Sequence, residues 1–280
     1  MADAVQASGA ELGSAQAGDG EAAASTDEAA AATPVKPAPD RPKPAAPLIS
    51  GKPKDAATLL IVRTDGDAGG QGGGPRVLMG RRHRGHAFMP DKWVFPGGRI
   101  DRADFGVPAA SELTPSVVAA LERTTTASRA RALACAAIRE TFEETGLLLG
   151  RAVAAVEPVP TARRNGPWSD FLARATPDLA ALDFVARAIT PPARTRRFDA
   201  RFFMAGAGAL VSLTPVDGWP GTGPGELDEL AWFDWDAAAG LDLPSITRAI
   251  LAEAALRLRD PARAIPFHRF HRGEHRLETV

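Results

Sequence analysis

The segment "RETFEETG", residues 139–146, concentrates three glutamates shortly before a glycine. In a helix, Glu140, Glu143 and Glu144 occupy positions i, i+3 and i+4, and they therefore share one face. Their like charges repel, and the C-terminal end of a helix favours cations rather than anions. The arginine that opens the segment can turn toward one carboxylate, and the closing glycine is typical of a helix end. The pattern predicts a helix that needs a further positive charge.

Two interpretations of this acidic face are open. Mg²⁺ and Mn²⁺ prefer oxygen ligands, so three carboxylates on one face suit a divalent cation. The simpler alternative is a solvent-exposed acidic helix turn, which is common. The upstream segment "VFPGGRID", residues 94–101, favours the cation site. Its two glycines form a turn whose backbone can approach a metal site without side-chain obstruction.

Together the two segments resemble the signature of the Nudix hydrolase family. The second half of that signature, with its Arg-Glu, Glu-Glu and Gly pattern, is matched by Arg139, Glu140, Glu143, Glu144, Gly146 and Leu147. Gly98 resembles the glycine that starts the signature. Thr141 stands where the family has an apolar residue, and Asp104 stands where it has a glutamate.

The spacing between the two halves departs further from the family pattern. Between Asp104 and Arg139 lie 34 residues, where the family has seven. We therefore expect an insertion at about residues 105–131. Closing a longer loop costs little, because closure entropy grows only logarithmically with length, so the two halves can still meet. An interrupted signature preceded by "FMPDKWVFPGG" is similar to the family branch that contains coenzyme A diphosphatases.

The resemblance implies a metal-dependent hydrolase that cleaves the diphosphate bond of a nucleoside diphosphate linked to another group. The implied cofactor is Mg²⁺ or Mn²⁺. In this interpretation Arg139 orients a glutamate, and Glu226, in "GPGELDELAWF", serves as the base or as an extra ligand. The arginines of "RRHRGHAF" contact substrate phosphates, with an ordinary basic loop as the alternative. The expected catalytic residues are Arg139, Glu140, Glu143 and Glu226, the metal ligands are Glu140, Glu143 and Glu144, and the substrate-binding residues are Gly97, Gly98, Arg81 and Arg82.

Several substrates and one other class of function stay open. Coenzyme A or an acyl derivative is preferred, because the interrupted signature is similar to that branch. ADP-ribose, dinucleoside polyphosphates and dinucleotide cofactors are alternatives within the same class. A nucleotide-sensing Nudix-fold regulatory module without catalysis is the alternative from another class. Such modules usually lack the glutamates, whereas this chain keeps all three.

The pattern of the remaining chain predicts strands mixed with helices, and therefore an α/β fold. The resemblance narrows this to a Nudix-type α/β/α sandwich with a mixed β-sheet. A surface strand with a turn at Gly273 is expected near the C-terminus. The expected strands are 57–63, 76–82, 196–205 and 229–235, and the expected helical segments are 115–147 and 244–260.

The first 50 residues differ from the rest in composition. They are rich in Ala, Gly, Ser and Pro, so they cannot bury enough apolar surface to offset the entropy of ordering. We expect a disordered tail at 1–50 and one Nudix hydrolase domain at 51–280. Residues 1–35 contain six acids and neither Lys nor Arg, which is unlike a secretory or mitochondrial leader.

Charge and cysteine content set the remaining expectations. The chain has a net charge of −1, so the part after the acidic tail is mildly basic, which suits a small anionic nucleotide. A single cysteine, Cys135, rules out an intrachain disulfide. No apolar run is long enough to span a membrane. We expect a cytoplasmic location, a small-molecule nucleotide substrate, no membrane or nucleic-acid partner, and a homodimer as an open alternative.

Overall fold

A computed structural model gives the fold of the chain. It describes residues 51–64, 74–85, 90–153, 166–192, 194, 196–216 and 227–280. All of them belong to one compact unit, Asp40–Val280. The expected tail, 1–50, lies outside the described residues, and so does Glu226.

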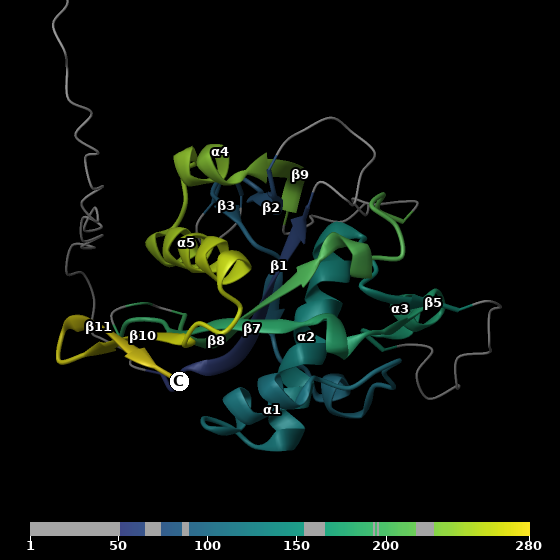
Figure 1. Ribbon diagram of the computed structural model, residues 1–280, viewed down its shortest axis with the longest axis horizontal. Helices are drawn as coiled ribbons and strands as arrows, with labels where there is room; N and C mark the ends of the chain where they lie inside the picture. The colour runs from purple at the N-terminus through teal and green to yellow at the C-terminus, as the bar shows by residue number, and fades with distance from the viewer. Residues whose placement is uncertain are drawn as a thin grey trace, which may run out of the picture. The chain divides into compact units, whose positions relative to one another are not determined.

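Nine strands of the described residues form one mixed sheet (Figure 1). Along the sheet their order is β11 (Glu274–Thr279), β10 (Pro266–His271), β7 (Asp183–Ile189), β8 (Phe198–Gly206), β1 (Lys54–Arg63), β2 (Arg76–Arg82) and β3 (Trp93–Val94). Off this path, β4 (Gly97–Arg99) pairs with β1, and β9 (Leu227–Asp234) pairs with β2. The pairs β1–β8 and β7–β10 are parallel, and the others are antiparallel.

Helices cover both faces of this sheet, because β1 is apolar on both sides. Leu59 and Ile61 belong to the core beneath one face, whereas Leu60 and Val62 belong to the core beneath the other. The first core is completed by α1 (Pro115–Glu122) and α2 (Ala127–Thr145), and the second by α4 (Trp235–Gly240) and α5 (Ser245–Arg259). Figure 1 shows α2 and α5 on opposite sides of the sheet. The prediction of an α/β sandwich around a mixed sheet is confirmed.

Smaller elements surround the α2 side of the sheet. They are β5 (Gly150–Ala152), β6 (Ala175–Pro177), α3 (Ser169–Leu172) and the 3₁₀ turns η2 (Arg102–Gly106), η4 (Leu179–Ala181) and η5 (Ala207–Ala209). Strands β5 and β6 form a separate two-stranded sheet.

The segment 105–131, expected as an insertion, folds as the end of η2, the whole of α1 and the first turn of α2. Val117 and Leu121 of α1 are buried in the core on the α2 side. Arg131 ties the segment together, since it forms an ion pair with Glu112 at 2.8 Å and donates to the carbonyl of Val107 at 2.9 Å. The segment therefore contributes to the core instead of forming a loop that stands apart from it.

The range from about 115 to 147, expected to be helical, is helical in two parts. The structure has two helices, α1 and α2, separated by residues 123–126. Three consecutive threonines, Thr124, Thr125 and Thr126, occupy the break, and Thr126 has the extended conformation of a helix N-cap. Branching at Cβ lowers helix propensity, which favours a break at these three residues. Thr126 stands at the N-cap position of α2 without a side-chain cap hydrogen bond.

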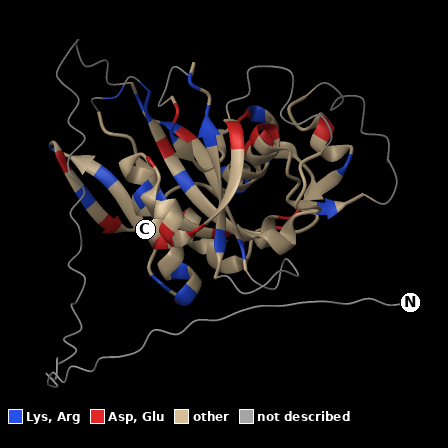
Figure 2. Ribbon diagram, turned by 90° about the horizontal axis from the view of Figure 1, so that it is seen from above, with Lys and Arg blue, Asp and Glu red and all other residues tan. Residues whose placement is uncertain are grey.

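Other expected elements agree closely with the structure. The strand expected at 76–82 is β2, and the closing helix expected at 244–260 is α5. The expected turn at Gly273 joins β10 to β11 as an antiparallel hairpin, and Gly273 has a φ of 84°. Basic and acidic residues are interspersed along the sheet (Figure 2). Within the described ranges, no helix is both long and apolar enough to cross a membrane.

Candidate functional site

The last turns of α2 carry the three glutamates. The helix ends at Thr145, and Gly146 follows in the left-handed conformation, with a φ of 69° and its N–H donating to the carbonyl of Phe142 at 2.8 Å. Of the glutamates, Glu144 is buried, Glu140 has a side chain that is 17% exposed, and Glu143 has a side chain that is 37% exposed. The acidic face thus runs from the core to the surface.

Strand β4 brings the glycine turn against this face. The N–H of Gly97 donates to Oε2 of Glu144 at 2.9 Å. A Cβ atom placed on Gly98 would overlap the carboxylate of Glu140, so glycine at this position lets that carboxylate keep its place. Strand β1 holds the turn in place, since Gly97 pairs with Thr58 and Gly98 with Ala57. The structure therefore brings together Gly97, Gly98, Glu140 and Glu144, four of the residues singled out in the sequence.

Arg139 lies at the centre of the site, with a side chain that is only 5% exposed. Its Nη1 donates to Oε1 of Glu140 at 2.8 Å and to Oε2 of Glu143 at 3.0 Å. Its Nη2 donates to the carbonyl of Arg99 at 2.9 Å, which anchors α2 to β4. Arg139 does turn toward a carboxylate, and it contacts further acceptors as well, because a guanidinium has five N–H donors.

Asp104 holds the guanidinium of Arg139 in place, and its side chain is fully buried. Its carboxylate accepts two hydrogen bonds from Arg139, from Nε at 2.9 Å and from Nη2 at 3.1 Å, which form a bidentate pair. It also accepts from the backbone N–H of Asp101 at 2.7 Å. Burial alone would lower the pKa of Arg139, but the hydrogen bonds to Asp104 and the charges of Glu140, Asp104 and Glu143 raise it above its usual value.

Trp168 completes the support of Asp104 and was not anticipated from the sequence. Its indole Nε1 donates to Oδ1 of Asp104 at 2.9 Å, and the ring is buried in edge-to-face contact with Phe171. A buried indole N–H usually has an acceptor, but the acceptor lies 64 residues away in the chain. Sequence proximity therefore gave no signal for this contact.

Glu143 is a weaker acid than an ordinary glutamate. Burial raises its pKa to about 7, although the positive charge of Arg139 opposes the shift, and the charges of Glu140 and Asp104 raise it further. Its carboxylate therefore binds a proton more readily than an ordinary glutamate does.

The carboxylates of Glu140, Glu143 and Glu144 offer oxygen atoms, which are the ligands that hard divalent cations prefer. As they stand, no three His, Cys, Asp or Glu side chains of the described residues are gathered closely enough to hold a metal ion. Arg139 instead bridges two of the carboxylates. The donor set fits Mg²⁺ or Mn²⁺, and the role of these residues as ligands stays a prediction.

The other candidate residues lie elsewhere or beyond the described part. Arg81 forms an ion pair with Glu229 at 2.7 Å, and its guanidinium lies 6.0 Å from the centre of the Trp93 ring. Arg81 and Arg82 are half-buried at the end of β2. Their contact with substrate phosphates stays a prediction, as does the role of Glu226.

Solved structures similar to this one include several Nudix hydrolases. A NUDIX hydrolase from Alicyclobacillus acidocaldarius is 27% identical, with a TM-score of 0.48, over 72% of this chain and 90% of that chain. The Nudix hydrolase RenU from M. smegmatis is 16% identical, with a TM-score of 0.37, over 74% and 86%. The NUDIX domain of Shewanella oneidensis NrtR, solved with ADP ribose, is 12% identical, with a TM-score of 0.39, over 74% and 90%.

No protein-family model and no curated protein matches the chain significantly. Because each of the three TM-scores is below 0.5, these similarities carry no weight for function on their own. The functional argument therefore depends on the residues of the site.

Proposed function

We propose that the chain is a metal-dependent hydrolase of the Nudix type, which cleaves the diphosphate bond of a nucleoside diphosphate linked to another group. One observation carries the proposal: the acidic face of α2 is held against the Gly97–Gly98 turn. The N–H of Gly97 donates to Glu144 at 2.9 Å, and Gly98 leaves space that the Glu140 carboxylate fills. An acidic helix turn that is only exposed to solvent would not be expected to pack its carboxylates against a glycine turn in this way.

In this proposal Glu140, Glu143 and Glu144 hold Mg²⁺ or Mn²⁺. A bound divalent ion neutralises phosphate oxygens and lowers the pKa of a water molecule. The chain's own contribution is to orient the carboxylates. Arg139 fixes Glu140 and Glu143, and Asp104 fixes Arg139 in turn. Glu226 is retained as the candidate base or extra ligand.

The preferred substrate is coenzyme A or an acyl derivative, and the support for it is the interrupted signature. ADP-ribose, dinucleoside polyphosphates and dinucleotide cofactors remain alternatives in the same class. A cytoplasmic location and a homodimer also stay predictions.

The test is hydrolysis of a nucleotide-diphosphate panel that includes coenzyme A, with products identified by mass. We expect two monophosphate products with Mg²⁺ or Mn²⁺ and none with EDTA. If the chain hydrolyses no member with either metal, a nucleotide-sensing role without catalysis replaces the proposal.

A substitution tests the residue assignment. Glu144→Gln keeps an oxygen that accepts from Gly97 but removes the negative charge. We expect kcat/KM to fall by at least roughly 100-fold, since losing a residue that only supports a metal ligand already costs about 10–100-fold. The matched control is Glu122→Gln, an exposed acid of α1. A Glu144→Gln protein that retains full activity would contradict the assignment.

A further inference from the structure

Strand β11 forms one end of the sheet (Figure 1). In the part of the chain that the structure describes, it pairs with β10 on one side and with no strand on the other. Proteins often protect such an edge with a proline or a bulge, because its free N–H and C=O groups can pair with another strand. Residues 274–279 contain no proline, and their register with β10 has no bulge. The edge is therefore open to a further strand.

The hairpin loop determines which backbone groups point to this edge. Arg272 and Gly273 have φ values of 51° and 84°, as a two-residue hairpin turn requires. The residues on either side of such a turn form a hydrogen-bonded pair, and hydrogen-bonded and non-hydrogen-bonded pairs then alternate along the strands. The N–H of Val280 donates to the carbonyl of Ile265 at 2.9 Å, in agreement with this alternation. The residues of β11 that direct their backbone groups to the open edge are therefore His275, Leu277 and Thr279.

The side chains of β11 differ between the two faces of the sheet. Successive side chains of a strand point to opposite faces, so Glu274, Arg276 and Glu278 share one face. Leu277 lies on the other face, and it is 63% exposed. The edge thus combines a row of charges that alternate in sign with an exposed leucine.

Arg276 lies beside another positive charge. In the hairpin it is directly opposite Arg269, and like charges in opposite positions are destabilising. Arg269 forms an ion pair with Glu278 at 2.6 Å, whereas Arg276 has no ion pair with any acid among the described residues. A carboxylate beyond the open edge would supply the counter-charge.

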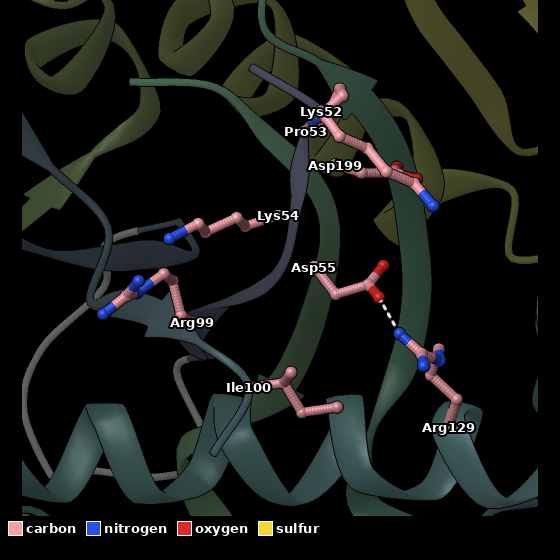
Figure 3. Close-up of a pocket in the computed structure, with 8 residues that line it drawn as sticks. All are labelled: Lys52, Pro53, Lys54, Asp55, Arg99, Ile100, Arg129 and Asp199. Carbon is pink, nitrogen blue, oxygen red and sulfur yellow. Dashed lines mark hydrogen bonds and ion pairs between the residues drawn. The ribbon is translucent and has the colours of Figure 1, made fainter. Parts of the chain in front are cut away.

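Acids in the interior of the sheet show the contrast. Asp55 of β1 forms ion pairs with Arg129, as Figure 3 shows, and with Arg201 at 2.9 Å. Asp199 of β8 forms ion pairs with Arg201 at 3.1 Å and with Arg187 at 2.7 Å. Neighbouring elements thus supply the counter-charges in the interior, and the edge strand has a neighbour on one side only.

A second copy of β11 can pair with this edge in the antiparallel direction, about a two-fold axis. Outward-directed backbone groups must face each other, so the axis has to pass through a residue and not between two residues. An axis at Leu277 places Arg276 beside the partner's Glu278 and Leu277 beside the partner's Leu277. An axis at Arg276 or at Glu278 would place like charges beside each other. An axis at His275 also brings opposite charges together, but it overlaps only residues 274–276 of the strand.

We propose that the chain forms a homodimer in which β11 pairs antiparallel with β11 of a second copy, with the axis at Leu277. The ion pair between Arg276 and the partner's Glu278 then occurs twice, and the two leucines cover each other. The contact involves one short strand from each chain, so we expect a weak dimer with a dissociation constant of roughly 10 µM. Strands β10, β7 and β8 lie between this edge and β1, so the inference does not depend on the proposed function.

Sedimentation equilibrium of the full-length chain tests the dimer. The average mass is expected to rise with concentration from that of one chain toward that of two. Arg276→Glu and Glu278→Arg are each expected to remain monomeric, because each places like charges at both contacts. The control Arg102→Glu reverses the charge of an exposed residue of η2, and it should dimerise normally. A full-length chain that is monomeric at about 50 times the expected dissociation constant, or normal dimerisation of Arg276→Glu, overturns the proposal.

Mixing the two monomeric variants tests the register. With the axis at Leu277, an Arg276→Glu chain and a Glu278→Arg chain present opposite charges to each other at both contacts. An equimolar mixture is therefore expected to recover the dimer. A substitution that had only damaged its own hairpin would not be rescued in this way. Failure of the mixture to dimerise, or dimerisation of Glu278→Arg alone as an axis at His275 allows, contradicts the proposed pairing.

Amide hydrogen exchange identifies what covers the edge. The outward N–H groups of His275, Leu277 and Thr279 are expected to exchange more slowly as the protein concentration rises. Arg276→Glu should abolish this protection. Protection of these amides that is independent of concentration would show that a segment of the same chain occupies the edge, and it would overturn the dimer.

Discussion

At the scale of single residues, the site depends on a series of side-chain hydrogen bonds that begins at the glutamates and ends at Trp168. The indole N–H fixes Asp104, Asp104 fixes Arg139, and Arg139 fixes two glutamates. Each donor and acceptor in this chain is buried or partly buried, where an unmet hydrogen bond is costly. Trp168 is therefore a positioning residue for the candidate site.

Trp168→Phe is expected to destabilise the protein by about 1–3 kcal/mol, because Asp104 loses a buried donor while the aromatic packing against Phe171 is kept. The measurement is urea unfolding, combined with Asp104→Asn in a double-mutant cycle. A coupling close to zero between the two positions would show that the hydrogen bond has no role. The variant is also expected to lower kcat more than it raises KM, since it disturbs the glutamates rather than the substrate.

At the scale of elements, the two glycines of β4 have different tasks. A Cβ on Gly97 would lie 2.5 Å from the carbonyl oxygen of Ala57 and 2.7 Å from Cα of Thr58, both backbone atoms of β1. A Cβ on Gly98 would meet only the flexible carboxylate of Glu140. Backbone cannot move aside without disturbing the sheet, whereas a carboxylate can rotate away.

This difference predicts opposite outcomes for two alanine substitutions. Gly97→Ala is expected to lower the unfolding free energy by about 1–3 kcal/mol, as overpacking does. Gly98→Ala is expected to change stability less but to reduce activity and Mn²⁺ affinity, because it displaces Glu140. Thermal unfolding and metal titration distinguish the two. A Gly98→Ala protein with normal Mn²⁺ affinity would argue against a ligand role for Glu140.

The hairpin β10–β11 carries a stacked histidine pair. Nδ1 of His268 and Nε2 of His275 are 3.3 Å apart, with ring centres separated by 5.4 Å. Burial lowers the pKa of His268, and the charge of His275 lowers it further, although Glu253 opposes the shift. Glu253 is itself paired with Arg263 at 3.2 Å.

The hairpin should therefore lose stability in mild acid. Because the pKa of His268 is lower in the folded state than its ordinary value of 6.5, the unfolded chain binds the proton first. The unfolding free energy is expected to be unaffected by this group above that value and to decline as the pH falls below it. Urea unfolding between pH 7.5 and 5.5 measures the decline, and His268→Gln should reduce its slope. An unchanged slope would assign the acid sensitivity to other groups.

At the scale of the whole molecule, the two cores that the described residues form begin at Ala57. The composition of residues 1–50 predicts that they bury little apolar surface. Removing them is therefore expected to change the unfolding free energy by less than about 0.5 kcal/mol, as substitutions away from buried features do. Chemical denaturation of the full and shortened chains measures this. A larger loss would mean that the Ala- and Pro-rich segment stabilises the domain.

Local patterns in the sequence predicted what depends on neighbouring residues. Strand β2 has the expected bounds, since "RVLMGRR" is a segment of strand length that follows a glycine-rich stretch. Helix α2 ends before Gly146 because glycine readily adopts a positive φ. The family resemblance brought Gly98 and Glu140 together across the segment 105–131. The contact of Trp168 with Asp104 and the partners of Arg201 were not predictable, since they depend on how distant segments pack.

The pairing of β1 with β8 has a consequence for how the chain matures. Lys54 lies beside Phe198 in this parallel pair, so one partner leaves the ribosome long before the other. At ordinary rates of synthesis the delay is on the order of ten seconds. During that time the apolar residues of β1 lack their neighbouring strand on the β8 side, and they offer a binding site to chaperones. Translation speed and chaperone supply should therefore influence the yield of folded protein.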